Sequence, residues 1–165
     1  MTSTDTDMEP SELQEGAIAP PIEVATGTGE TFRLSDQKGK IVVLYFYPKA
    51  DTPGCTTEAC EFRDALPRFD GVDAVVVGAS PDSVKAQAKF AEKYGLKFPL
   101  LADEDHSVAD AYGVWKEKSM YGKKYWGVDR TTFVIDREGK IARIFRKVRP
   151  AGHAEQVREF VASLQ

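Results

Sequence analysis

Residues 41–60 read IVVLYFYPKADTPGCTTEAC, and this stretch decides the fold. The apolar run at residues 41–46 is typical of a buried β-strand, and the Thr-Pro-Gly sequence after it is typical of a loop that ends at a helix. Thr52 is a favourable N-cap residue and Pro53 suits the first helical position, so Cys55 takes the third. The stretch therefore predicts a strand, a loop and the start of a helix that carries a cysteine.

Both cysteines of the chain, Cys55 and Cys60, lie in this predicted helix. Peptide dipoles and unpaired N–H groups at a helix start favour a negative charge, so Cys55 lies where a thiol becomes a thiolate. On a helical projection Cys55, Ala59 and Phe62 fall on one apolar face within about 40°, a place that a small core residue would also take. The helix-start position and the loop before it favour thiol redox chemistry.

Strands and helices alternate along the rest of the chain. Such an order predicts an α/β sandwich with a mixed central β-sheet flanked by helices, preceded by an N-terminal β-hairpin. The expected elements are a hairpin at 22–24 and 31–34, strands at 41–47, 73–79 and 98–101, helices between the first two strands and at 82–94, 107–112 and 153–164, and a second hairpin at 132–136 and 140–145.

Composition limits the class of protein. The 165 residues are 42% hydrophobic and 29% charged, which suits one globular domain, here residues 17–165. Residues 1–16 hold five acidic and no basic residues, and we expect a disordered acidic tail. A net charge of −4 argues against nucleic-acid binding. The chain shows no signal peptide or membrane span, so we expect a cytoplasmic protein.

The loop motif carries a family resemblance. Pro48, Thr52 and Cys55 stand as P-x-x-x-T-x-x-C and resemble the active-site loop of peroxiredoxins. Cys60, five residues further on, is similar to the resolving cysteine of the branch called bacterioferritin comigratory protein or peroxiredoxin Q. Residues 127–136, GVDRTTFVID, resemble the arginine-bearing strand of that family.

This resemblance implies a thioredoxin-like fold and a thiol-dependent peroxidase that reduces hydrogen peroxide and organic hydroperoxides without metal, haem, flavin or other cofactor. Cys55 would be the peroxidatic nucleophile and Cys60 the resolving residue, joined in an intramolecular Cys55–Cys60 disulfide. Thioredoxin or a similar dithiol protein would reduce that disulfide. The branch further implies a monomer, although an aromatic edge could support a weak homodimer.

The resemblance gives candidate roles to Thr52, Pro48 and Arg130, and helical spacing gives one to Glu58, three residues after Cys55. Thr52 would contact the peroxide, although a helix cap alone explains a threonine there, and Pro48 would shield the sulfur, although it is also a strand terminator. Arg130 would stabilise the thiolate and polarise the O–O bond, whereas a lone arginine beside a strand is usually a solvated charge. Glu58 would hold that guanidinium or only complement the helix dipole.

The remaining signals are weak. His106 and His153 are isolated, so we expect no metal site. Tyr121, Tyr125 and Trp126 fall in a predicted loop with three lysines, where they could line the pocket, form a partner surface or simply pack.

Two other functions remain open at this point. A thiol–disulfide oxidoreductase would expect C-x-x-C, whereas this chain has C-x-x-x-x-C. A redox sensor would use the same cysteine oxidation, but it would stop after one equivalent of peroxide.

Helix geometry predicts that the reaction requires local unfolding. Two residues five apart on an ideal helix have Cα atoms about 8.7 Å apart, and a disulfide needs about 6.8 Å or less. Pro67 limits the helix to about a dozen residues, and so short a helix is marginal without its tertiary packing. We therefore expect Cys55 and Cys60 in one helix when reduced and a locally unfolded segment when oxidised.

Overall fold

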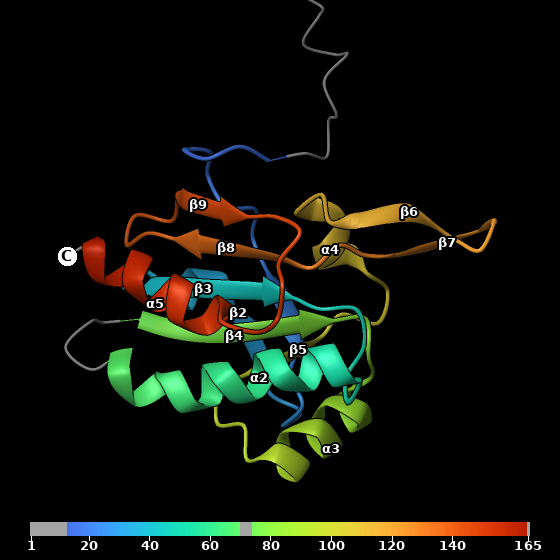
Figure 1. Ribbon diagram of the computed structural model, residues 1–165. Coiled ribbons are helices and arrows are strands. Elements are labelled where there is room, and N and C mark those ends of the chain that lie inside the picture. The colour runs from blue at the N-terminus through green and yellow to red at the C-terminus, as the bar shows by residue number, and fades with distance from the viewer. Residues whose placement is uncertain (1–12, 70–73, 165) are drawn as a thin grey trace, which may run out of the picture.

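The computed structural model describes residues 13–69 and 74–164. Its centre is a five-stranded sheet in the order β5-β4-β3-β8-β9 (Figure 1). β3 pairs parallel with β4 and antiparallel with β8, which confirms the predicted mixed sheet. The strands are β3 Ile41–Phe46, β4 Ala74–Ser80, β5 Leu100–Ala102, β8 Thr131–Ile135 and β9 Ile141–Phe145.

β3 lies at the centre of the sheet and is buried on both faces, which explains its unbroken apolar sequence. Val43 and Tyr45 face the cluster formed with helices α2, Pro53–Ala65, and α5, His153–Ser163. These two helices lie beside each other over the sheet (Figure 1). Leu44 faces the opposite cluster, which the N-terminal segment and helix α4, Ser107–Ala111, cover. The chain leaves β3 at Phe46 and enters α2 over the first of these faces, so the cysteine-bearing helix start lies at the carboxyl end of the central strand.

Helices α2 and α3 end where their sequence signals favour, whereas α3 begins at Val84 rather than at the predicted residue 82. α2 ends at Ala65 and a 3₁₀ turn at Leu66–Phe69 follows, in agreement with the proline at position 67. α3 spans Val84–Tyr94, begins where the Ser83 side chain accepts a hydrogen bond from the Ala86 amide, and ends at Gly95 in the left-handed region.

The N-terminal hairpin is confirmed as β1, Glu23–Ala25, paired with β2, Thr31–Arg33, and a 3₁₀ turn at Leu34–Gln37 follows it. Residues 13–16, which we expected to belong to the tail, contact β9. The Gly16 amide donates to the carbonyl of Ile141, and the Ile144 amide donates to the carboxylate of Glu15. The rest of the predicted tail, residues 1–12, lies outside the described residues, as does Asp73 at the expected start of β4.

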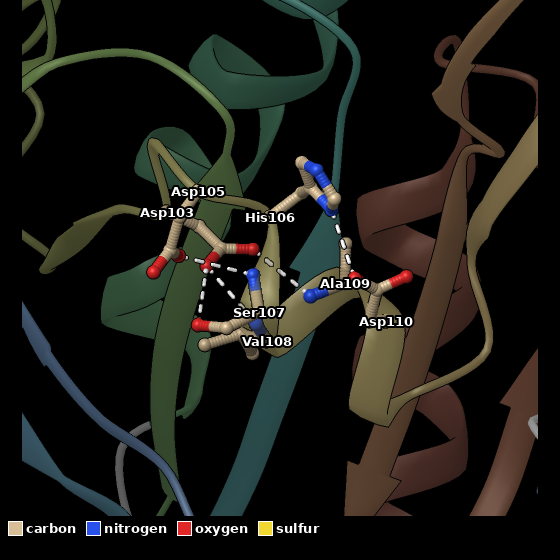
Figure 2. Close-up of polar contacts among 7 residues, drawn as sticks. All are labelled: Asp103, Asp105, His106, Ser107, Val108, Ala109 and Asp110. Carbon is tan, nitrogen blue, oxygen red and sulfur yellow. Dashed lines mark hydrogen bonds and ion pairs between the residues drawn. The ribbon is translucent and has the colours of Figure 1, made fainter.

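The N-cap residue of the short helix α4, Ser107–Ala111, makes no side-chain cap bond. The acidic loop before the helix supplies these hydrogen bonds instead. Figure 2 shows the carboxylate of Asp103 accepting hydrogen bonds from the amides of Val108 and Ala109 at 3.0 and 2.9 Å. His106 pairs with Asp110 and stacks on the ring of Trp115, with centroids 4.0 Å apart. His106 therefore has a structural role at the base of the next hairpin.

The segment around Tyr125 and Trp126 corrects the prediction of a loop. It forms an antiparallel hairpin of β6, Trp115–Met120, and β7, Lys123–Val128, which projects from the body (Figure 1). Tyr121 and Gly122 form its turn with positive φ angles of 53° and 78°. The lysine-rich sequence did not indicate this hairpin. Its strands lack a buried face and therefore show no regular alternation of apolar and polar residues.

A smaller difference from the prediction concerns the start of β5. β5 begins at Leu100 rather than at residue 98, since Pro99 has no amide proton for a ladder and instead its carbonyl accepts from Gly78. Within the part of the chain that the structure describes, no helix is both long and apolar enough to cross a bilayer.

Candidate active site

The loop between β3 and α2 is held by polar contacts from neighbouring elements. The Ala50 amide donates to the carboxylate of Asp82 at 2.8 Å, and Ser80 donates to the same oxygen at 2.6 Å. Tyr47 donates to the buried side chain of Gln87 at 2.7 Å. Because the loop is fixed at these points, the first turn of α2 has a defined position against the sheet.

Cys55 is the third residue of α2 and is 1% exposed. Arg130, which lies in the link between β7 and β8, donates from Nη2 to its Sγ at 3.3 Å. A helix N-terminus and a guanidinium both favour a negative charge at this sulfur. The two residues are 75 positions apart in the sequence, so the fold alone joins them.

Glu58 holds the other side of the same guanidinium. Its Oε1 accepts from Nη1 of Arg130 at 2.6 Å, and its side chain is completely buried. Burial raises the pKa of Glu58 to about 7, although the charge of Arg130 opposes this shift. Burial also disfavours the charge of Arg130, but Glu58 and Cys55 outweigh it, so the pKa of Arg130 lies above its usual value.

Gly54 makes room for this arrangement. A Cβ atom at this position would lie 3.3 Å from Nη2 of Arg130 and 3.4 Å from Cγ of Pro150. The backbone of Arg130 is itself fixed, since its carbonyl accepts from the Val148 amide at 3.1 Å. A side chain at position 54 would therefore push the guanidinium away from the sulfur.

Aromatic rings form the inner wall of the site. Tyr45 stacks on Phe62 of α2 with centroids 4.6 Å apart and on Tyr47 at 5.4 Å. The Tyr45 hydroxyl and Oε2 of Glu58 are buried and have no hydrogen-bond partner within residues 13–69 and 74–164. Burial and the neighbouring tyrosine raise the pKa of Tyr45, so its phenol stays neutral.

Cys60 differs from Cys55 in its surroundings. It is half-buried, it lies on the same continuous helix, and both thiols are free. The expectation that the reduced protein carries both cysteines in one helix is therefore confirmed.

Thr52 and Pro48 occupy the loop but not as the sequence suggested. The Thr52 backbone is the N-cap of α2, yet its hydroxyl donates to the carbonyl of Lys49 at 2.8 Å and makes no cap bond, so the predicted side-chain cap is wrong. Because the Thr52 hydroxyl donates its proton to this bond, it can form further hydrogen bonds only as an acceptor, through its lone pairs. Pro48 is exposed, and its shielding of Cys55 stays a prediction.

Sequence reasoning missed the residues that fix the loop from α3. Asp82 was only the first residue of the helix predicted at 82–94, yet its carboxylate accepts hydrogen bonds from Ala50 and Ser80. Asp51 accepts hydrogen bonds from Lys93 and from Tyr94, 42 and 43 residues further on. No local pattern reports such a contact, because it depends on how α3 packs beside the loop.

His153 is also structural in its contacts. It is buried, bonds to Thr132 and Gln156, and packs edge-on against Phe62 and Phe145. Among the residues that the structure describes, no three acidic, histidine or cysteine side chains gather as metal ligands.

Comparisons with known proteins identify the family of this chain. The model of the AhpC/TSA family matches residues 16–144. The chain is 50% identical to peroxiredoxin Bcp of Bacillus subtilis over 144 residues, 87% of this chain and 92% of that protein. It is 43% identical to peroxiredoxin Bcp of Escherichia coli over 145 residues, 88% and 93% of the two chains.

A solved structure of the Xanthomonas campestris bacterioferritin comigratory protein, described for its alkyl peroxide reduction activity, matches with a TM-score of 0.83. The two sequences are 40% identical, and the match covers 87% of this chain and 91% of that one.

A thioredoxin-like fold with a cysteine at a helix start beside an arginine defines a thiol-dependent peroxidase. The chain belongs to the AhpC/TSA family, within the peroxiredoxins of the Bcp or peroxiredoxin Q branch. It acts on peroxides and is restored by a thiol reductant.

Proposed function

We propose that this enzyme reduces hydrogen peroxide and organic hydroperoxides through a Cys55 sulfenic acid and an intramolecular Cys55–Cys60 disulfide, and that thioredoxin or a similar dithiol protein recycles it. The observation that carries the proposal is the 3.3 Å contact between Nη2 of Arg130 and Sγ of Cys55 at the start of α2. In the same proposal Thr52 and Pro48, the other candidate residues of the loop, orient the peroxide and exclude water.

In the first step the Cys55 thiolate attacks one peroxide oxygen. A sulfur–oxygen bond forms as the O–O bond breaks, the alcohol or water leaves after taking a proton, and sulfur is oxidised to sulfenic acid. Arg130 stabilises the thiolate and the charge that develops on the leaving oxygen. Glu58 fixes the orientation of Arg130 through the 2.6 Å ion pair, and Thr52 offers its lone pairs to the peroxide hydroxyl.

In the second step the Cys60 thiol attacks the sulfenic sulfur. A disulfide forms and one water leaves, which conserves the two oxidising equivalents. An external dithiol then exchanges with this disulfide and restores both thiols. A compartment that keeps dithiol proteins reduced, such as the cytoplasm, would supply that partner.

Turnover with thioredoxin, thioredoxin reductase and NADPH tests the proposal. Wild type should consume peroxide continuously, and Cys55→Ser should fall to the uncatalysed rate because its hydroxyl is not ionised at neutral pH. Cys60→Ser should consume one equivalent and hold a Cys55 sulfenate that mass spectrometry detects. Equal activity of wild type and Cys55→Ser would refute the assignment, and a wild type that stops after one equivalent would indicate a sensor instead.

A further inference from the structure

Asp51, four residues before Cys55, is clamped by the last turn of α3. Its carboxylate accepts from Nζ of Lys93 at 3.0 Å and from the hydroxyl of Tyr94 at 2.8 Å. The Tyr94 bond and then the Lys93 bond hold the pKa of Asp51 below its usual value, so the clamp is charged at neutral pH. Asp51 has a φ of 62°, a left-handed conformation that is strained for a residue with a side chain.

Tyr94 also contacts α2 itself, on the far side of Cys60. Its backbone carbonyl accepts from Nη1 of Arg63 at 2.7 Å, and Arg63 follows Cys60 by three residues. Its ring packs edge-on against Phe90, which is buried in the core, so Tyr94 is itself well fixed. A single residue of α3 therefore holds the chain on both sides of the segment that contains Cys55 and Cys60.

A disulfide between these cysteines requires that segment to change shape. In an ideal helix their Cα atoms are about 8.7 Å apart, beyond the reach of a disulfide. Unwinding from the N-terminal side moves the loop at Asp51, whereas unwinding from the C-terminal side moves Arg63. Either route strains or breaks a contact with Tyr94.

We infer that Tyr94, assisted by Lys93, is a positioning residue for the resolving step: it latches the Asp51 loop in the closed arrangement and sets how fast the Cys55–Cys60 disulfide forms. This inference rests on the proposed function, because it concerns the sulfenic acid that Cys55 forms. The latch prolongs the life of that sulfenic acid. A second peroxide can then oxidise it to sulfinic acid, in competition with disulfide formation: one S–O bond forms, the O–O bond of the peroxide breaks, and one alcohol or water is released.

Tyr94→Phe removes the hydrogen bond to Asp51 but keeps the ring against Phe90 and the carbonyl toward Arg63. One lost hydrogen bond should raise the rate of disulfide formation by about two- to tenfold. The yield of sulfinic acid at a fixed peroxide concentration should fall by a similar factor, and the rate of peroxide attack should change by less than about twofold. Lys93→Met should act in the same direction with a smaller effect, since it removes an exposed ion pair, and Lys93→Arg should restore the wild-type rate.

Acid quench followed by mass spectrometry, at a peroxide excess that completes the first step quickly, measures sulfenic acid, disulfide and sulfinic acid in each variant. Tyr125→Phe and Lys89→Met are matched controls, because they change a tyrosine on the projecting hairpin and an exposed lysine of α3. Faster disulfide formation in Tyr94→Phe with unchanged controls supports the latch. If Cys55 of Tyr94→Phe is oxidised at the wild-type rate but its disulfide forms at an unchanged or slower rate, the latch alone is overturned. If Cys55 of the wild-type protein is not oxidised at all, the proposed function is overturned as well.

Discussion

Cys55 and Cys60 lie on the same helix five residues apart, yet the fold gives them different surroundings. Cys55 is 1% exposed, lies at the helix start and accepts a hydrogen bond from Arg130. Cys60 is half-buried in the middle of the helix. The comparison teaches that two identical side chains on one helix can differ in reactivity through their neighbours, because charge and burial rather than residue type control thiolate chemistry. In the proposed function this difference makes Cys55 the nucleophile and Cys60 the resolving group.

The largest expected effect comes from removing the charge that distinguishes the two thiols. Arg130→Met should slow peroxide attack on Cys55 by about 10²–10³-fold, the usual cost of losing one preorganised donor at a developing charge. The Cys60 step should change far less, since the guanidinium contacts Cys55. Stopped-flow oxidation measures the first step, and Arg33→Met, which removes an exposed arginine, is the control. An attack rate within a factor of about three of wild type would remove Arg130 from the reaction.

A smaller effect is expected from crowding the same guanidinium. Gly54→Ala places a Cβ 3.3 Å from Nη2 of Arg130. The crowding should displace the guanidinium by a few tenths of an ångström, so peroxide attack should slow by less than about tenfold. Gly29→Ala is a useful contrast, because its Cβ meets nothing within 4 Å but its φ of 89° strains an alanine; it should lower stability and leave the attack rate unchanged. Equal attack rates in Gly54→Ala and wild type would show that the guanidinium has room to move.

The smallest effect on the first step concerns Glu58, between the two cysteines. Its pKa rises to about 7 on folding, so between about pH 4.5 and 7 the folded protein binds a proton that the unfolded chain releases. Wild-type stability should therefore fall as pH rises through that window and level off above it. Glu58→Gln lacks this titration, so its stability relative to wild type should increase over the same range, by up to a few kcal/mol.

Denaturant unfolding at several pH values measures this difference, with Glu117→Gln as an exposed control. A stability difference that does not vary with pH would contradict the raised pKa. Peroxide attack in Glu58→Gln should slow only about threefold, because the amide oxygen still accepts from Arg130.

The sequence predicted those features that local patterns encode. The β3 run, the position of Pro53 and the glycine after α3 fix the strand, the helix start and the helix end within a residue or two. The family resemblance pointed to Arg130, whose place in the sequence alone said little, and helical spacing suggested Glu58 as its partner. The structure brings Arg130 to Cys55 and Glu58 to Arg130.

Features that depend on packing could not be read from the sequence. The Thr52 hydroxyl bonds to the Lys49 carbonyl and makes no cap bond to the helix, an outcome that the loop conformation decides. The β6–β7 hairpin has no buried face to mark it, and the clamp on Asp51 joins segments over 40 residues apart. Such contacts need the assembled fold.

The central claim is that the two cysteines meet only when α2 opens locally. Hydrogen exchange by mass spectrometry on peptides that cover residues 50–66 tests it most directly, in the reduced protein and in the protein with a confirmed Cys55–Cys60 disulfide. We predict slow exchange in the reduced state, where these residues are helical, and faster exchange over residues 55–60 in the oxidised state, with β3 equally protected in both. Equal protection of residues 50–66 in the two states would contradict the account.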